Sequence, residues 1–154
     1  SLFVIVECLY ILQANSDNTS GNNPYLTQTP VLIQIDSQGN SMKNVSVAMT
    51  KVDRKMGQKL VPALAQPIKL VLTKADELAA KRVKPVKKAA IDFVNRQLGD
   101  EIIRLQQLQK VNPSISDVEI EQMQATLNQA LKRIKESTLY LDAVRVVINN
   151  PRNK

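Results

Sequence analysis

The chain has 154 residues, of which 44% are hydrophobic and 3% aromatic, and it contains neither histidine nor tryptophan. Its length suits one ordinary domain, so we expect a single domain over residues 1–154. The lack of histidine removes the most common general base and the most common zinc ligand. The scarcity of aromatic rings argues against binding nucleic acid by stacking on its bases.

The net charge of +7 is concentrated in the middle of the sequence. Residues 51–110 carry fourteen basic and six acidic side chains, residues 1–50 carry one and three, and residues 111–154 carry six and five. A concentration of this kind favours contact with nucleic acid or with an acidic protein surface.

The first segment, residues 3–13, is apolar and rich in Val, Ile, Phe and Tyr, which predicts a strand. It is too short to span a bilayer, so we expect no membrane contact. Because the sequence opens inside a strand without Met, we expect it to be a fragment of a longer protein. Cys8 is the single cysteine; we expect a small buried hydrophobic residue, with a reactive thiol as the alternative.

A second strand is predicted over residues 29–36, "TPVLIQID". Residues 15–24 before it are turn and loop formers, and residues 36–40 after it predict a tight turn in which Gly39 can adopt positive φ. Residues 42–50 are ambiguous between strand and helix. We expect the two strands to pair antiparallel across the long loop.

Helical periodicity begins at Val52, and Pro67 stands where a second helix is expected to start. From there one amphipathic pattern continues to about Lys110. We expect Pro85 to kink or split this long helix and Gly99 to be a second weak point. The apolar stripe consists of Leu72, Ala75, Ala79, Val83, Val86, Ala90, Phe93, Val94, Ile102, Leu105 and Leu108.

A helix break and restart is predicted over residues 112–119, "NPSISDVE". Pro113 ends one helix, and Ser116 followed by Glu119 is the pattern of a capping box. The acidic residues at this helix start are expected to favour the positive end of the helix dipole rather than to bind a metal. The new helix is expected to run to about Ser137.

The sequence closes with β-forming residues, and we expect the strand over residues 144–148 to lie inside a sheet rather than at its edge. The predicted fold class is α+β, with a small antiparallel sheet made from the N-terminal strands and the C-terminal strand and with long antiparallel helices between them. Within it we expect a β-rich part over residues 3–50, a helical part over residues 51–138 and a closing strand over residues 139–150.

The clearest candidate site is the basic segment "KRVKPVKK" over residues 81–88. With Val83 and Val86 facing inward on a helix, Lys81, Lys84 and Lys88 fall on the opposite side, which is the ordinary placing of a solvated face. Arg82 and Lys87 flank the apolar stripe. The alternative is an electrostatic patch that contacts DNA, RNA or an acidic protein surface. The residues of this candidate patch are Lys81, Arg82, Lys84, Lys87 and Lys88.

The acidic residues give no catalytic pattern. Asp36 is expected to be a turn residue, and Asp142 is expected to form a structural ion pair with Arg145 or with a helix lysine. The four glycines are not spaced to form a phosphate-binding loop, and no G-x-x-x-x-G-K-[ST] motif is present. We therefore assign no catalytic, cofactor-binding or metal residue and do not expect this chain to be an enzyme by itself.

Four segments, in this order, resemble the C-terminal region of the RapA (HepA) family, bacterial RNA polymerase-associated ATPases of the SWI/SNF type. None is a catalytic signature, so the likeness rests on the ordered set and covers about residues 3–150. The segments are "TPVLIQIDSQGN" (29–40), "GQKLV" (57–61), "RLQQLQKVNPSISDVEIE" (104–121) and "LDAVRVVI" (141–148).

The resemblance implies a non-catalytic C-terminal domain of a cytoplasmic, nucleoid-associated bacterial protein. Such a protein binds RNA polymerase and DNA, hydrolyses ATP with helicase-like lobes, and takes part in transcription regulation and polymerase recycling. The implied partners are RNA polymerase and the ATPase domains of the same chain, while ATP and magnesium belong to those other domains. The alternative is a free-standing basic module that binds DNA or RNA through residues 81–88.

Overall fold

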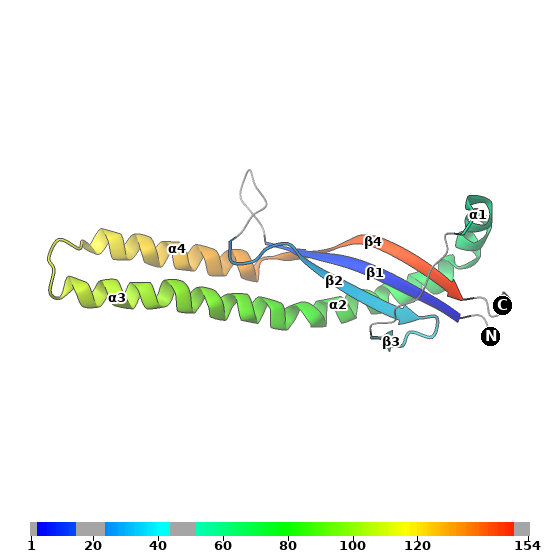
Figure 1. Ribbon diagram of the computed structural model, residues 1–154, viewed down its shortest axis with the longest axis horizontal. Helices are drawn as coiled ribbons and strands as arrows, with labels where there is room; N and C mark the ends of the chain where they lie inside the picture. Colours follow the sequence, from blue (N-terminus) through cyan, green and yellow to red (C-terminus); the bar gives the residue numbers. More distant parts are fainter. Residues whose placement is uncertain (1–2, 15–23, 44–51, 150–154) are drawn as a thin grey trace. The chain divides into compact units, whose positions relative to one another are not determined.

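A computed structural model of the protein describes residues 3–14, 24–43 and 52–149 (Figure 1). Strands stand at both ends of this sequence and helices stand between them, which confirms the predicted α+β class. The elements are β1 (Phe3–Gln13), β2 (Thr29–Asp36), β3 (Ser41–Met42), α1 (Arg54–Ala63), α2 (Ala65–Val94), the π-helical turn η1 (Asn95–Gly99), α3 (Asp100–Gln109), α4 (Asp117–Lys135) and β4 (Thr138–Asn149). Most of the loop predicted over residues 15–24 and of the ambiguous segment 42–50 lies outside the described residues.

The strands form one antiparallel sheet in the order β3-β2-β1-β4. Figure 1 shows β1 running opposite to both β2 and β4, as the predicted antiparallel pairing requires. Strand β4 is longer than predicted and lies at the edge of the described sheet, so the prediction of an interior strand is wrong. Residues 140–145 of β4 are all exposed. The apolar residues among them, such as Leu141 and Val144, are therefore not buried on both faces.

The turn after β2 is built by Asp36 and Gly39. The Asp36 carboxylate accepts hydrogen bonds from the backbone N–H groups of Gln38 (2.9 Å) and Asn40 (2.8 Å), and Gly39 has the predicted positive φ of 87°. Hydrogen bonds from Asn40, first from its side chain and then from its backbone, lower the pKa of Asp36. Asp36 is thus a turn residue, as expected. The turn sets the β2–β3 register, which pairs Gln34 with Met42 and Ile35 with Ser41.

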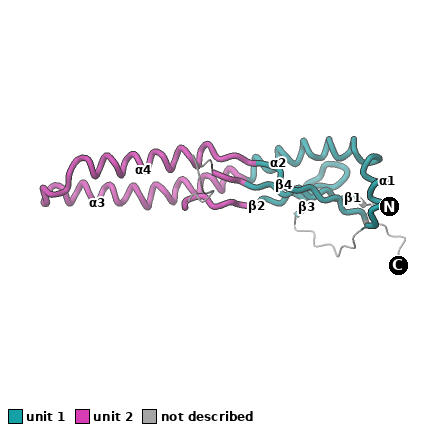
Figure 2. Tube along the Cα trace, turned by 90° about the horizontal axis from the view of Figure 1, so that it is seen from above, with its two compact units in different colours: residues 1–11, 30–82, 140–154 teal, residues 12–29, 83–139 magenta. Residues whose placement is uncertain are grey.

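The chain divides into two compact units (Figure 2). The first contains residues 1–11, 30–82 and 140–154, and the second contains residues 12–29 and 83–139. The first unit therefore holds most of the sheet, helix α1 and the first part of α2, and the second holds the antiparallel helices.

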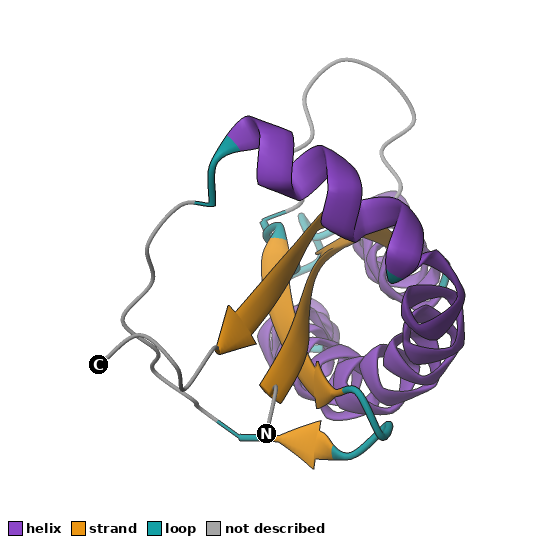
Figure 3. Ribbon diagram, turned by 90° about the vertical axis from the view of Figure 1, so that its right-hand side faces the viewer, coloured by secondary structure: helices purple, strands orange, loops and turns teal. Residues whose placement is uncertain are grey.

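The core of the first unit lies between the sheet and the first part of α2. Figure 3 shows α1 crossing above the strands and α2 following it along one side of them. Side chains at every second position of β1 and β2 point toward α2 because strand residues alternate between faces. Ala75 and Ala79, both 0% exposed, present small side chains to the sheet and so allow the helix to lie close to it. The other buried members are Val4, Val6, Cys8, Tyr10, Val31, Ile33, Ile35 and Val71.

The second unit is a helical hairpin in which α4 packs against η1 and α3. The predicted stripe is confirmed at most positions but not at Phe93 and Leu108, which are 44% and 37% exposed. Phe93 instead packs its ring beside that of Tyr25, with the ring centroids 6.5 Å apart. The buried side chains of the hairpin are Val83, Ala90, Val94, Ile102, Leu127, Ala130 and Ile134.

The two predicted weak points of the long helix differ in outcome. Helix α2 is not split at Pro85. Pro85 and Lys81 are both exposed, so water can bond the Lys81 carbonyl for which Pro85 offers no N–H. At Gly99 the prediction is confirmed, because the helix there becomes the π-helical turn η1 before it continues as α3.

The hairpin turn is held by local hydrogen bonds. The Ser116 hydroxyl accepts a hydrogen bond from the Glu119 backbone N–H at 3.3 Å, which confirms Ser116 as the N-cap of α4. The Gln109 side-chain amide at the end of α3 donates to the Ile115 carbonyl (3.2 Å) and to the Asp117 carboxylate (2.6 Å). Helix α4 then ends at Lys135, two residues before the predicted end.

Candidate functional site

The predicted basic patch lies within helix α2. Lys81, Arg82, Lys84 and Lys88 are exposed and Lys87 is half-buried. Val83 on the same segment is buried at 6% exposure. The helix therefore presents Lys81, Lys84 and Lys88 away from the buried stripe, as the spacing predicted.

Two of the five cations make structural hydrogen bonds. Arg82 donates from Nη1 to the backbone carbonyl of Leu32 on β2. Lys87 donates from Nζ to the carbonyl of Ser137, just beyond α4, at 3.0 Å. A strand carbonyl and a carbonyl after a helix end both lack partners in their own elements, so a nearby cation can satisfy them. These two residues hold the fold together and have less freedom to contact a ligand.

The other three, Lys81, Lys84 and Lys88, lie on one side of α2 because they are three and four residues apart. Within residues 3–14, 24–43 and 52–149, the structure gives them no ion pair or hydrogen bond. They can attract a phosphate or a carboxylate, but they supply charge alone. Nothing in their arrangement selects a particular ligand.

A second cluster, which the sequence analysis did not single out, lies on the opposite face of the sheet from α2. Glu7 on β1 is only 6% exposed. Its Oε1 accepts a hydrogen bond from the Gln34 side chain on β2 (2.8 Å), and its Oε2 accepts from Nε and Nη2 of Arg145 on β4. The carboxylate thus joins three neighbouring strands. Charge on a nearly buried carboxylate is tolerated because it is both paired and hydrogen-bonded.

Asp142 was predicted to pair with Arg145 or with a helix lysine, and the pairing with Arg145 is wrong. Asp142 and Arg145 are three residues apart on one strand, so their side chains point to opposite faces. Arg145 instead reaches Glu7 across the sheet. The signal for this pair was present in the sequence, as one acidic residue inside the apolar segment "FVIVECLYILQ".

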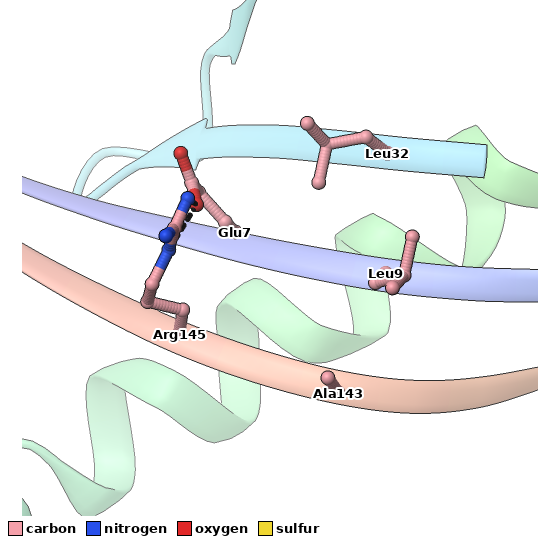
Figure 4. Close-up of a pocket in the computed structure, with 5 residues that line it drawn as sticks. All are labelled: Glu7, Leu9, Leu32, Ala143 and Arg145. Atoms are coloured by element: carbon pink, nitrogen blue, oxygen red, sulfur yellow. Dashed lines mark hydrogen bonds and ion pairs between the residues drawn. The ribbon is translucent and has the colours of Figure 1, made fainter. Parts of the chain in front are cut away.

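A pocket of about 320 Å³ adjoins this pair on the same face. Figure 4 shows Glu7 and Arg145 meeting at one end of it, with Leu9 and Leu32 toward the other end. Ala143 completes the lining. A volume at the low end of the range for ligand pockets suits a side chain or two rather than a large cofactor. The pocket is therefore apolar over most of its lining, with a carboxylate–guanidinium pair at one end.

Cys8 and Tyr10 lie on the face of β1 that meets α2. Cys8 is 0% exposed, and burial, followed by the nearby charge of Asp76, raises its pKa to about 11. Burial and a hydrogen bond to Asp76 also raise the pKa of Tyr10. Cys8 is therefore a protonated, buried thiol at neutral pH, which agrees with the interpretation of a small hydrophobic residue.

Among the described residues, no group of three or more His, Cys, Asp or Glu side chains is placed to hold a metal ion. Likewise, none of the described helices is both long enough and apolar enough to cross a membrane. The described residues include two candidate surfaces for contact, the lysines of α2 and the Glu7–Arg145 pocket.

Comparison with known proteins identifies the family. The profile of the RNA polymerase recycling family, C-terminal region (RapA_C), matches residues 3–149. The chain belongs to this family. The match covers every described element from β1 to β4 and confirms the resemblance found in the sequence.

Individual relatives agree with the family assignment at modest identity. The chain is 28% identical over 151 residues to the RNA polymerase-associated protein RapA of Vibrio parahaemolyticus, 28% identical to that of Erwinia tasmaniensis and 27% identical to that of Photobacterium profundum. In each case the alignment covers 94% of this chain and 16% of the relative. The chain therefore spans about one-sixth of the length of these curated relatives.

Proposed function

We propose that this chain is the non-catalytic C-terminal interaction module of an RNA polymerase-associated, ATP-dependent SWI/SNF-type protein of the bacterial cytoplasm, associated with the nucleoid. Its partners are RNA polymerase and the ATPase domains of the same protein. In this role it helps to hold the motor on polymerase during transcription regulation and polymerase recycling. The observation that carries the proposal is the family match over residues 3–149.

The geometry supports a contact role. The sheet face opposite α2 carries exposed apolar side chains, among them Leu32 and Leu141 at 45% and 40% exposure. Exposed apolar side chains that gather on one face are typical of a protein contact surface. The Glu7–Arg145 pair on this face, with a buried carboxylate and an exposed guanidinium, supplies a polar feature that a partner has to match.

ATP and magnesium are assigned in this proposal to other domains of the longer protein. No group of three or more His, Cys, Asp or Glu side chains in the described parts of the chain is placed to hold a metal ion. The glycines of the chain are also not spaced for a phosphate-binding loop. We therefore derive no step of ATP hydrolysis from these residues, and we propose that helicase-like activity and DNA binding reside in the longer protein.

The proposal is tested with the full-length protein that contains this region and with the same protein lacking residues 3–149. Pull-down of RNA polymerase and ATPase rates are measured for both. We expect the deletion to weaken polymerase binding at least about tenfold while ATP hydrolysis without polymerase persists, because the deleted region holds an interface and no reaction centre. Unchanged polymerase binding together with loss of all ATPase activity would contradict the proposal.

A second candidate function is a nucleic-acid-binding module that acts through α2. The observation in its favour is the exposed side of Lys81, Lys84 and Lys88. Replacing all three with Glu should then weaken binding to duplex or single-stranded DNA without unfolding the chain. The slope of the logarithm of the binding constant against the logarithm of the salt concentration should become less steep, as expected for the loss of roughly three phosphate contacts. Binding that does not change in the triple variant would remove these lysines from consideration.

The matched control carries the same change in charge at another site. Lys55, Lys59 and Lys69 are also exposed, and they lie on helices α1 and α2 outside residues 81–88. If both triple variants lose DNA binding equally, net charge rather than a patch on α2 explains the effect. If the chain binds no DNA even at low salt, the interaction module remains the better account.

A further inference from the structure

The pocket beside Glu7 and Arg145 combines three features. It is concave, its walls are aliphatic, and one end carries a guanidinium that is still largely open to solvent. We propose that this pocket is the anchor point of the protein contact and that it takes an aliphatic side chain flanked by an acidic residue of the partner. The inference deepens the proposed function and, for the identity of the partner, rests on it.

The aliphatic part of the proposal follows from the lining. Leu9 and Leu32 contribute branched side chains, and Ala143 leaves room between the strands. Leu141 adds exposed apolar surface on the same face, because it is two residues from Ala143 on β4. An aliphatic group that enters removes both its own surface and that of Leu32 from water, which is the main favourable term in such contacts.

The acidic part follows from the geometry of Arg145. Its side chain is 59% exposed although its Nε and Nη2 are bonded to Glu7. Both of these donors meet the same carboxylate oxygen, so Nη1 and one hydrogen of Nη2 remain available. The N–H donors of a guanidinium all lie in its plane, so arginine can bind carboxylates along two of its edges. A second carboxylate, from a partner, can therefore complete the arrangement.

Glu7 and Gln34 act as positioning residues in this arrangement. Gln34 fixes one oxygen of Glu7, and Glu7 in turn holds the guanidinium over the sheet instead of leaving it free in solvent. Holding a long side chain in place before binding reduces the conformational entropy that is lost on binding. This gives a reason for a charged residue at the centre of an otherwise apolar strand.

The same features argue against a nucleic-acid ligand for this pocket. A phosphate would lie close to the Glu7 carboxylate, and the remaining lining offers it no donor. Lys81, on the first part of α2, supplies no help here, because that part of α2 covers the other face of the sheet. The chemistry of the pocket therefore favours a protein, and in the proposed function that protein is RNA polymerase.

The first experiment identifies the ligand chemistry without polymerase. The full 154-residue chain is used to select from a phage-displayed library of random 12-residue peptides. We expect enriched peptides with Leu, Ile, Val or Met next to Asp or Glu. Leu32→Ser and Arg145→Gln should each weaken their binding at least about fivefold. A selection that enriches no such peptides, or peptides whose binding neither substitution changes, would overturn the proposal.

Two choices keep the test specific. Gln at position 145 can still donate a hydrogen bond to Glu7, so the buried carboxylate keeps a partner and the fold is retained. Leu70→Ser is the matched control, because Leu70 is 76% exposed on α2 and outside the pocket. It should leave peptide binding unchanged. Circular dichroism of each variant confirms folding.

The second experiment uses purified RNA polymerase core enzyme and the same variants. If the wild-type chain binds polymerase and both pocket variants bind at least about fivefold more weakly, the pocket is the polymerase contact. If all variants bind like wild type, the pocket proposal fails for polymerase while the proposed function stands. If wild type does not bind, the proposed function fails, and the peptide selection alone decides whether the pocket is a docking site.

Discussion

Lys84 and Lys87 stand three residues apart on α2, and the structure predicts that they contribute differently to stability. Lys87 donates a hydrogen bond of 3.0 Å to the Ser137 carbonyl and is half-buried, whereas Lys84 is exposed. Replacing either with Ala changes helix propensity by the same small amount. The difference between the two variants therefore isolates the bond to Ser137.

The size of that difference can be estimated. A hydrogen bond with a charged donor contributes about 1.5–3 kcal/mol, and partial exposure of Lys87 reduces this to about 1 kcal/mol. With a urea dependence of about 2 kcal/mol per molar, Lys87→Ala should lower the unfolding midpoint by about 0.5 M. Lys84→Ala should remain within about 0.5 kcal/mol of wild type.

The assay is urea unfolding followed by circular dichroism at 222 nm. Equal midpoints for the two variants would show that the Lys87–Ser137 bond does not hold the hairpin, and Lys84 and Lys87 would then be equivalent surface charges. A lower midpoint for Lys84→Ala than for Lys87→Ala would contradict the orientation of α2 itself.

Three further predictions concern the fold around the two surfaces. Ala79→Leu should destabilise the chain by about 1–3 kcal/mol in urea unfolding because Ala79 meets the sheet. The control Ala80→Leu, at the exposed neighbouring position, should be nearly neutral. Equal effects would show that the face of α2 with Ala79 does not pack against the sheet. Ser116→Ala should cost about 0.5–1 kcal/mol through the lost cap of α4, measured as a lower melting temperature, and no change would mean that the long 3.3 Å bond contributes nothing. Cys8 should resist alkylation by iodoacetamide until the chain unfolds, and because its folded pKa of about 11 exceeds the ordinary 9.0, stability should fall as pH rises from about 9 to 11, less steeply in Cys8→Ala.

The regular elements were predictable because their residues follow a local rule. Apolar steps of three and four mark α2 through α3, and β-forming residues mark β1 and β2, so element type and order needed no tertiary information. The Ser116 cap and the positive φ of Gly39 were equally local, since each depends on the residue type at one position of a turn or helix end.

The failures concern what lies beside each element. An apolar run such as that of β4 does not say whether a strand is inside a sheet or at its edge. Composition shows which side chains avoid water, but it does not show whether another strand pairs on each side. Pro85 does not split α2, and both Pro85 and Lys81, four residues before it, are exposed, which cannot be read from the proline itself. Both outcomes depend on tertiary context.

The candidate site was predictable only in part. The basic segment was visible as charge, but the diversion of Arg82 and Lys87 into structural hydrogen bonds depends on carbonyls far away in sequence, at Leu32 and Ser137. The Glu7–Arg145 pair joins residues 138 positions apart. Its sequence signal was a single acidic residue in an apolar strand, which reports that a partner is needed but not which one.

The central claim is that this region of the RNA polymerase recycling family is an interaction module for polymerase. The most direct measurement is equilibrium titration of the purified 154-residue chain against RNA polymerase core enzyme, without ATP. The account predicts saturable binding at moderate salt that does not change when ATP and magnesium are added. No binding at low salt, or binding that requires ATP, would contradict it.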